Sequence, residues 1–196
     1  MIDMTNLDPS LVPLIQSLRL VVFDFDGVFT TNQVIVNQDG VESVVCNRSD
    51  GLGLRLLKAV DLENLILSME ANPVVVARAR KLKMQCIHNC ENKLEALNSL
   101  AQERGISLSQ IAFVGNDIND VESMYGVGVP VAVQDAYPEA KKAAKWVLSR
   151  PGGSGAIREF CEVVARVRMG LKAQESPWEK LAGRVYEKTT PIHVTT

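Results

Sequence analysis

The sequence contains only two histidines, His88 and His193, so acid–base or metal chemistry has to rely mainly on carboxylates. Its four cysteines form no Cys-x-x-Cys pair, which argues against a zinc ribbon and against a thioredoxin-type redox motif. Basic residues are not in excess, because 21 Lys and Arg stand against 23 Asp and Glu, a net charge of −2. A general nucleic-acid-binding protein normally carries a basic excess, so we expect no nucleic-acid partner.

Long apolar runs are also absent. The fully apolar stretches, such as Leu20 to Phe23, are far too short to span a bilayer. The first residues include Asp3 and Asp8 and no apolar segment of signal-peptide length. We therefore expect a soluble, cytoplasmic protein with free thiols and no membrane partner.

What is present fits a folded globular chain. Hydrophobic residues make up 46% and charged residues 22% of the 196 positions, which excludes a wholly disordered chain and suits one compact domain. We expect that domain to span residues 1–168. Residues 169–196 are polar and contain Pro177 and Pro191, so we expect a C-terminal tail in which Trp178 acts as an anchor.

Apolar and polar segments alternate along the chain as strands and helices do. Leu20 to Phe23 is a continuous apolar run, which is typical of a strand buried on both faces of a parallel sheet. Asp8 is the expected N-cap of the first helix. The alternation predicts an α/β fold, a Rossmann-like three-layer sandwich with a mostly parallel sheet. Strands are expected over 20–23, 65–67, 86–88, 111–114, 127–133 and 146–148, and helices over 8–18, 49–60, 73–83, 91–104, a short segment ending near 125, 138–144 and 155–168.

One segment breaks this alternation. Two β-rich runs, Gln33–Asn37 and Val41–Cys46, flank Asp39-Gly40, and Asp-Gly is a strong hairpin signal. We therefore expect a small β-hairpin over residues 31–47, inserted directly after the first strand of the sheet.

Polar side chains follow four of the predicted strands. The carboxyl ends of parallel strands meet at one edge of a sheet, and ligands bind there, so we expect these side chains to converge. They are Asp24 and Asp26 after the first strand, Ser68 and Glu70 after the second, Lys93 after the third, and Asn116, Asp117, Asn119 and Asp120 after the fourth.

These residue types suit phosphoryl transfer. Asp24 and Asp26 lie two residues apart, so on an extended backbone their side chains point the same way. One can attack phosphorus, and the other can move a proton to and from the ester oxygen. Attack on a phosphate by an anion needs charge neutralisation, which a magnesium ion and a lysine can supply. A serine and backbone N–H groups can hold the remaining phosphate oxygens.

In order and strand position, these motifs resemble the four motifs of the haloacid dehalogenase superfamily, over residues 19–168. The hairpin, Ser49–Gly53 and Gly152–Glu159 narrow the resemblance to the branch that has no cap domain. That branch contains phosphatases of 3-deoxy-octulosonate 8-phosphate, phosphatases of nonulosonate (sialic-acid-type) 9-phosphates, and the C-terminal domain of some CMP-sialic acid synthetases. The matching segments are Asp24-Phe25-Asp26-Gly27-Val28-Phe29-Thr30, Ser68, Lys93 and Gly115-Asn116-Asp117-Ile118-Asn119-Asp120.

The resemblance implies a role for each residue of the first three motifs. Asp24 would be the nucleophile that forms an aspartyl-phosphate, and it would also be a magnesium ligand. Asp26 would be the general acid and base, with its backbone carbonyl on the metal. Ser68, Lys93 and Gly27 would bind the transferring phosphate, and Lys93 would assist catalysis.

The fourth motif would complete the metal site. The family often has an aspartate where this chain has Asn116. An amide oxygen can ligate magnesium but is neutral, so Asp117 or Asp120 would carry more of the charge. Which of the three touches the metal stays open at this point. Asn119 and Asp120 would support the loop.

The second motif bears on the substrate. The octulosonate phosphatases commonly have Thr-Gly-Arg here, whereas this chain has Ser68-Met69-Glu70 followed by Lys81. This departure resembles the nonulosonate branch, so we expect a 3-deoxy-2-keto sugar acid phosphate with nine carbons, and octulosonate 8-phosphate as the alternative. Glu70 would accept sugar hydroxyls and Lys81 would pair with the carboxylate. Arg48 would also contact the substrate, as would Asp50 unless it only caps the following helix.

No segment is long enough to form a cap domain, so a single site would be open to water. In the capless branch neighbouring subunits close the site, which implies a homotetramer in which Arg158 or the tail acts across an interface. Two alternatives stay open: a non-catalytic tetramerisation module related to the CMP-sialic acid synthetases, and a broad-specificity or regulatory phosphatase. The presence of Asp24, Asp26 and Lys93 favours an enzyme over the first alternative.

Overall fold

A computed structural model of the chain describes residues 7–172 and 174–182. A six-stranded sheet forms its centre, with the order β5-β4-β1-β6-β7-β8 and parallel pairing between all neighbours. The predicted α/β fold with a mostly parallel sheet is confirmed. The strands are β1 (Leu20–Phe23), β4 (Glu63–Leu67), β5 (Gln85–Ile87), β6 (Ile111–Gly115), β7 (Val129–Ala132) and β8 (Trp146–Val147).

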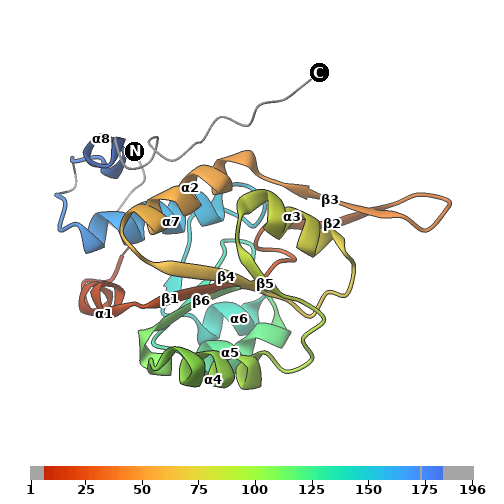
Figure 1. Cartoon of the computed structure of the whole chain (residues 1–196), viewed down its shortest axis with the longest axis horizontal. Coiled ribbons are helices and arrows are strands. Elements are labelled where there is room, and N and C mark those ends of the chain that lie inside the picture. Colours follow the sequence, from red (N-terminus) through yellow and green to blue (C-terminus); the bar gives the residue numbers. More distant parts are fainter. Residues whose placement is uncertain (1–6, 173, 183–196) are drawn as a thin grey trace.

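Helices cover both faces of the sheet and give three layers (Figure 1). One side carries α2 (Arg48–Ala59), α3 (Val74–Leu82) and α7 (Ala156–Arg168), with α1 (Leu11–Ser17) packed beside α7. The other side carries α4 (Lys93–Arg104), α5 (Val121–Gly126) and α6 (Pro138–Ala143). Two short turns of 3-10 helix, η1 (Leu108–Gln110) and η2 (Ile118–Asp120), precede β6 and α5.

Capping residues fix where the main helices begin. Asn47 accepts the Ser49 N–H at 2.9 Å and begins α2, and Asn92 accepts the Glu95 N–H at 3.0 Å and begins α4. Gly105 ends α4 in the left-handed region, at a φ of 61°. These groups satisfy backbone atoms that a helix end leaves unpaired.

The prediction that Asp8 caps the first helix is wrong. Its Oδ1 accepts the Ser10 N–H at 2.8 Å, which makes a turn ahead of the helix, and α1 begins at Leu11. The alternative that Asp50 caps α2 is also wrong, because Asn47 holds that position and Asp50 lies inside the first turn, fully buried.

The core lies along the central strands. Every residue of β1 and of β6 is buried, so these apolar runs face helices on both sides. The Phe23 ring packs edge-on against Phe29 and against Phe160, with ring centroids 5.6 Å apart in each pair. This packing holds the turn after β1 against α7 and so positions the polar residues of that turn.

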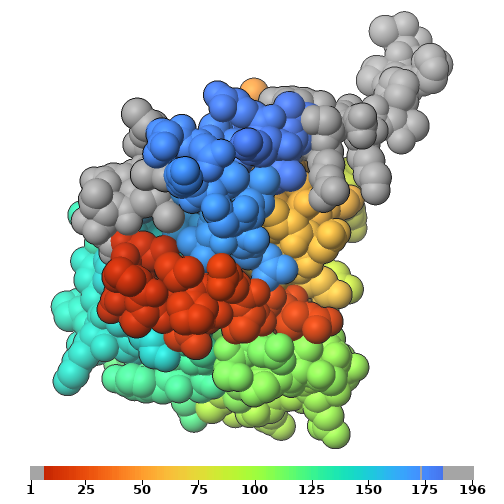
Figure 2. All heavy atoms as spheres, turned by 90° about the vertical axis from the view of Figure 1, so that its left-hand side faces the viewer, coloured from red at the N-terminus to blue at the C-terminus, as the bar shows by residue number. Residues whose placement is uncertain are grey.

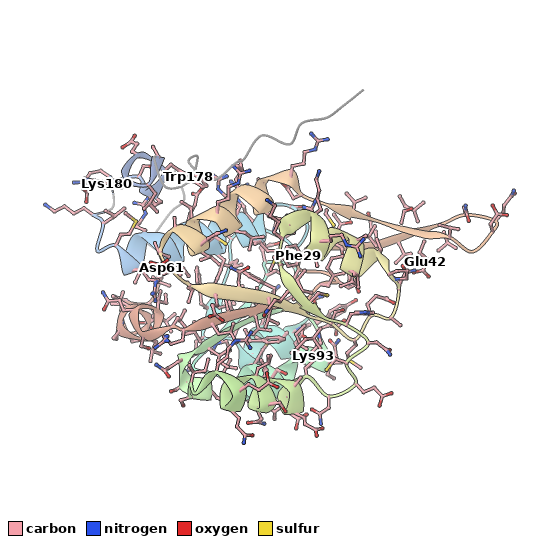
Figure 3. The ribbon with its side chains drawn as sticks, in the orientation of Figure 1. Phe29, Glu42, Asp61, Lys93, Trp178 and Lys180 are labelled. Atoms are coloured by element: carbon pink, nitrogen blue, oxygen red, sulfur yellow. The ribbon has the colours of Figure 1, made fainter. Side chains whose placement is uncertain are left out.

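The predicted hairpin projects from the body beside α3 as β2 (Thr30–Val36) and β3 (Glu42–Cys46) (Figure 1). Its turn is closed by Asn37 Oδ1, which accepts two backbone N–H groups at 3.0 and 2.9 Å. At the turn end of β3, where Glu42 pairs with Val36, Asn72 Nδ2 donates to Glu42 Oε2 at 3.0 Å (Figure 3 labels Glu42). This bond ties the first residue of β3 to the segment before α3, while most residues of the hairpin stay exposed to solvent.

The short helix α8 (Pro177–Lys180) packs over α7. Trp178 Nε1 donates to Glu162 Oε1 at 2.7 Å, and the Arg158 guanidinium lies 3.9 Å from the centre of the Trp178 ring. Leu181 extends this contact to a small apolar cluster with α2. The prediction that Trp178 anchors this segment is confirmed (Figure 3).

One face of the molecule brings α1 together with α7 and α8, from opposite ends of the described chain (Figure 2). Residues 183–196 of the predicted tail lie outside the described residues. Within residues 7–172 and 174–182, no helix is long and apolar enough to cross a membrane.

Candidate active site

The topology brings the four motifs to one edge of the sheet. β1 lies between β4 and β6, and each strand ends one residue before a polar side chain: Asp24, Ser68 and Asn116, respectively. Lys93, the first residue of α4, reaches the same place from the loop after β5. The predicted convergence of these side chains is therefore present.

A buried ammonium group joins two of the predicted carboxylates. Lys93 Nζ donates to Asp24 Oδ1 at 2.6 Å and to Asp120 Oδ1 at 2.7 Å, and all three side chains are buried (Figure 3 labels Lys93). The second oxygen of Asp120 accepts the N–H groups of Asn116, at 2.8 Å, and Asp117, at 3.3 Å. Asp120 thus fixes both the lysine and the loop after β6.

The charged groups of this cluster shift one another's pKa values. Burial, reinforced by the charge of Asp120, raises the pKa of Asp24 to about 7 against the opposing effect of Lys93. Burial lowers the pKa of Lys93, but Asp24 and Asp120 outweigh burial and raise it above its ordinary value. Burial and the charge of Glu70 raise the pKa of Asp26, which favours a carboxyl group that can carry a proton.

The residues around Asn116 fit a magnesium ion. One terminal atom of the Asn116 amide lies 2.8 Å from the Asp26 carbonyl oxygen and 3.2 Å from Asp24 Oδ2. As nitrogen, this atom donates to both groups. As oxygen, it completes a cluster of three oxygen atoms, which is the donor set that magnesium prefers. Because no three His, Cys, Asp or Glu side chains in the described part of the chain gather to hold a metal, a site here depends on this amide and this carbonyl.

Gly27 makes room for this arrangement. It has a φ of +73°, and a Cβ atom built on it would lie 2.1 Å from Asn116 Nδ2. Its N–H, expected to bind phosphate, donates to Thr30 Oγ1 at 3.0 Å. Thr30 is a site residue that sequence reasoning missed, although its place inside the first motif was a signal for it.

A cavity of about 390 Å³ opens over Asp24. Ser68 is buried beneath it, and its Oγ accepts the Glu70 N–H at 3.1 Å. Met69 lines the cavity as well, and its Sδ accepts a hydrogen bond from Asn119 Nδ2 at 3.5 Å. The lining consists of Asp24, Asp26, Ser68, Met69, Glu70, Ala71 and Asn119.

Other predicted site residues lie away from this cavity. Lys81, on α3, and Arg48, at the start of α2, are exposed and do not line it, and Asp50 is fully buried. Asp117 is half-buried, and its Oδ1 accepts the Ile118 N–H at 2.6 Å, so it caps η2. A second cavity of about 460 Å³ lies beside the last residues of α1, α2 and α7 and contains none of the motif residues.

Comparisons with known proteins agree with this architecture. A family model described as haloacid dehalogenase-like hydrolase matches residues 57–157. The 3-deoxy-D-manno-octulosonate 8-phosphate phosphatase KdsC of Escherichia coli K12 is 32% identical over 150 residues, which cover 76% of this chain and 80% of the relative. A solved HAD family hydrolase from Streptomyces avermitilis is 44% identical, with a TM-score of 0.74 over 80% of this chain and 87% of that one.

A third relative is a crystal structure of 3-deoxy-D-manno-octulosonate 8-phosphate phosphatase from Moraxella catarrhalis, in complex with magnesium, phosphate and KDO. It is 28% identical, with a TM-score of 0.79 over 82% of this chain and 93% of that one. The family match, the share of the chain that is covered and the common fold support the resemblance seen in the motifs. This chain belongs to the haloacid dehalogenase-like hydrolases.

Proposed function

We propose that this protein is a magnesium-dependent phosphatase that hydrolyses the phosphate monoester of a 3-deoxy-2-keto sugar acid. The observation that carries the proposal is the Asp24–Lys93–Asp120 cluster beneath a cavity that also exposes Asp26. The octulosonate phosphatases among its relatives support the reaction class.

The reaction proceeds in two halves. An Asp24 oxygen attacks phosphorus, and the bond from phosphorus to the ester oxygen breaks while Asp26 gives its proton to the departing sugar oxygen. Asp26 then takes a proton from water as that water attacks the aspartyl-phosphate, which frees inorganic phosphate and Asp24. Lys93 holds Asp24 Oδ1, so one face of the nucleophile is fixed.

Magnesium would be held by Asp24, the Asp26 carbonyl and Asn116, and when bound it supplies neutralisation of the phosphate charge. Asn116 is neutral, so this site has one charge fewer than a site with two aspartates. Ser68 lies at the buried end of the cavity, where its hydroxyl can hold a phosphate oxygen.

The first candidate substrate is 3-deoxy-D-manno-octulosonate 8-phosphate, because the E. coli and M. catarrhalis relatives bear that name. The relatives described above do not confirm the expected preference for a nine-carbon nonulosonate 9-phosphate. It stays a second candidate because Glu70 lines the cavity, where a carboxylate can accept sugar hydroxyls. Its Oε1 accepts the Asn72 N–H at 2.6 Å, which orients it.

The substrate carries a carboxylate, yet the described residues that line the cavity include no lysine or arginine. A second copy of the chain can supply the missing cation, and the hairpin has a surface on which a second copy can pack. Val34 and Val36 on one face of the hairpin, and Ile35, Val41 and Val45 on the other, are 47–60% exposed. We therefore infer a homotetramer in which hairpins pack together and a neighbouring cation, such as Lys81 or Arg48, completes each site.

The test is phosphate release in the presence of magnesium from octulosonate 8-phosphate and from nonulosonate 9-phosphate. We expect release from at least one of them, and less than about 1% of that rate in Asp24→Asn, because the nucleophile is lost. Equal rates on unrelated sugar phosphates would favour a broad-specificity enzyme. No release from any of them by folded, magnesium-loaded protein would favour the assembly module.

The assembly is tested separately by measuring the molar mass in solution. We expect a tetramer for the natural chain and a smaller species when Ile35 and Val45 are both replaced by lysine, since charges on that face oppose packing. A natural chain that is monomeric while fully active would contradict the shared-site proposal.

A further inference from the structure

Asp50 is a buried carboxyl group that the reaction does not use. Its exposed fraction is 0%, and neither carboxylate oxygen makes a well-formed hydrogen bond, although a backbone donor, the Arg158 N–H of α7, faces it. Buried carboxylates usually accept hydrogen bonds, as the buried Glu159 does: its two oxygens accept the Ser149 and Arg150 N–H groups at 2.8 and 2.9 Å. A buried carboxylate without well-formed hydrogen bonds destabilises a fold, so its presence needs a reason other than stability.

The groups that face Asp50 come from three elements. From α7, the backbone N–H and the side chain of Arg158 favour its charged form, and Cys161 has a raised pKa through burial and then the charge of Asp50. From α3, the Arg78 guanidinium favours the charged form as well, and its Nε is itself buried without a partner. At the end of β3, burial raises the pKa of Cys46, and the charge of Asp50 raises it further against the opposing effect of Arg78. Asp50 therefore supplies negative charge where the positive end of the α7 dipole lies.

The start of α7 is coupled to the catalytic turn. The loop that precedes it, Gly152–Gly155, packs on the backbone of the turn after β1: a Cβ on Gly152 would lie 1.7 Å from the Gly27 oxygen. Gly153 N–H donates to the Val28 oxygen at 3.0 Å. Because the two backbone segments are in close contact, a shift of the first turn of α7 also moves the turn that follows Asp26.

We propose that Asp50 is a positioning residue for the reaction: its buried charge holds the first turn of α7, so that Gly152–Gly155 braces the turn carrying Asp26. This inference rests on the proposed phosphatase function. The charge is kept for geometry although it lowers stability. If Asp50 served stability alone, removing its charge would lower the stability of the protein instead of raising it, so a stability measurement separates the two roles.

The test compares Asp50→Asn with the natural protein at pH 8, on octulosonate 8-phosphate and on p-nitrophenyl phosphate. The amide keeps the shape and removes the charge. We expect the melting temperature to rise by about 4 °C or more. We expect kcat to fall about tenfold with KM within about twofold, because Asp26 is misplaced while the cavity is intact. Glu159→Gln is the matched control and should lower the melting temperature, because its partners lose a charged acceptor.

The outcomes separate the two proposals. A more stable Asp50→Asn with reduced kcat supports the positioning role. A less stable variant, or one with unchanged kcat, overturns it. If the natural protein releases phosphate from neither compound, the proposed function fails and the positioning role falls with it. Activity on p-nitrophenyl phosphate alone would reject the sugar-acid substrate but still allow the kcat comparison to decide the role of Asp50.

Discussion

Replacing Lys93 by methionine removes the one charge that holds two buried carboxylates together. Asp24 is 4% exposed and Asp120 is 0% exposed, and Lys93 Nζ lies 2.6 and 2.7 Å from their oxygens. Methionine has a similar length and no charge, so the change is chiefly electrostatic.

The expected loss follows from the geometry. Removing one partner of a buried ion pair costs about 3–5 kcal/mol, because the remaining charge has neither water nor a counter-ion. Total stabilities are about 5–15 kcal/mol, so Lys93→Met removes a large share of the free energy of unfolding. Removing Lys93 raises the pKa of Asp24 above its value of about 7 in the natural protein, so we expect the loss to shrink as the pH falls toward 7 and Asp24 of the variant takes up a proton.

The assay is urea unfolding followed by circular dichroism, with EDTA present so that no divalent cation replaces the lysine. The matched variant is Asp24→Asn/Lys93→Met, which keeps only one of the two carboxylates. We expect it to regain about half of the lost free energy, so the two substitutions are strongly non-additive. A Lys93→Met loss below about 1 kcal/mol, or simple additivity with Asp24→Asn, would refute this account of the cluster.

Three further predictions concern single positions. Gly27→Ala should lower kcat at least about 100-fold, measured as phosphate release, because its Cβ would lie 2.1 Å from Asn116 Nδ2 and displace a ligand group. Asn116→Ala should raise the magnesium concentration for half-maximal activity about tenfold or more, whereas Asp117→Asn, which removes a charge from the cap of η2, should change it less than about twofold. Burial raises the folded-state pKa of Asp50 from 3.8 to about 7, so its contribution to stability is full below pH 3.8 and is lost as the pH rises through 7. Urea unfolding at pH 5 and pH 8 should therefore show the natural protein losing about 3 kcal/mol more than Asp50→Asn, and equal losses would contradict the buried charge.

The sequence by itself determined the fold class and the location of the chemistry. A strand buried on both faces is recognisable as an unbroken apolar run, as at Leu20–Phe23, because burial on both sides leaves no polar positions. Parallel strands put their carboxyl ends at one edge, so motif order was enough to predict that Asp24, Ser68 and Lys93 would meet.

Only the tertiary structure decided which partner each acidic residue of the loop after β6 has. Asp120 pairs with Lys93 across 27 residues, while Asp117, three positions earlier in the chain, caps η2. Both are aspartates in one short loop, and local sequence rules treat them alike. Their roles separate through the packing of α4 and the loop after β6, which places one carboxylate and not the other within 2.7 Å of a buried ammonium.

The same reason explains why the prediction that Asp50 caps α2 is wrong. Its position in the first turn of α2 fits a capping role locally. Its burial arises because α7 packs so closely on α2 that a Cβ on Gly53 would lie 2.9 Å from the Arg158 Cα. Local propensities are set by neighbours in the chain, whereas burial and charge pairing are set by segments that meet only when the whole sheet and its helices are assembled.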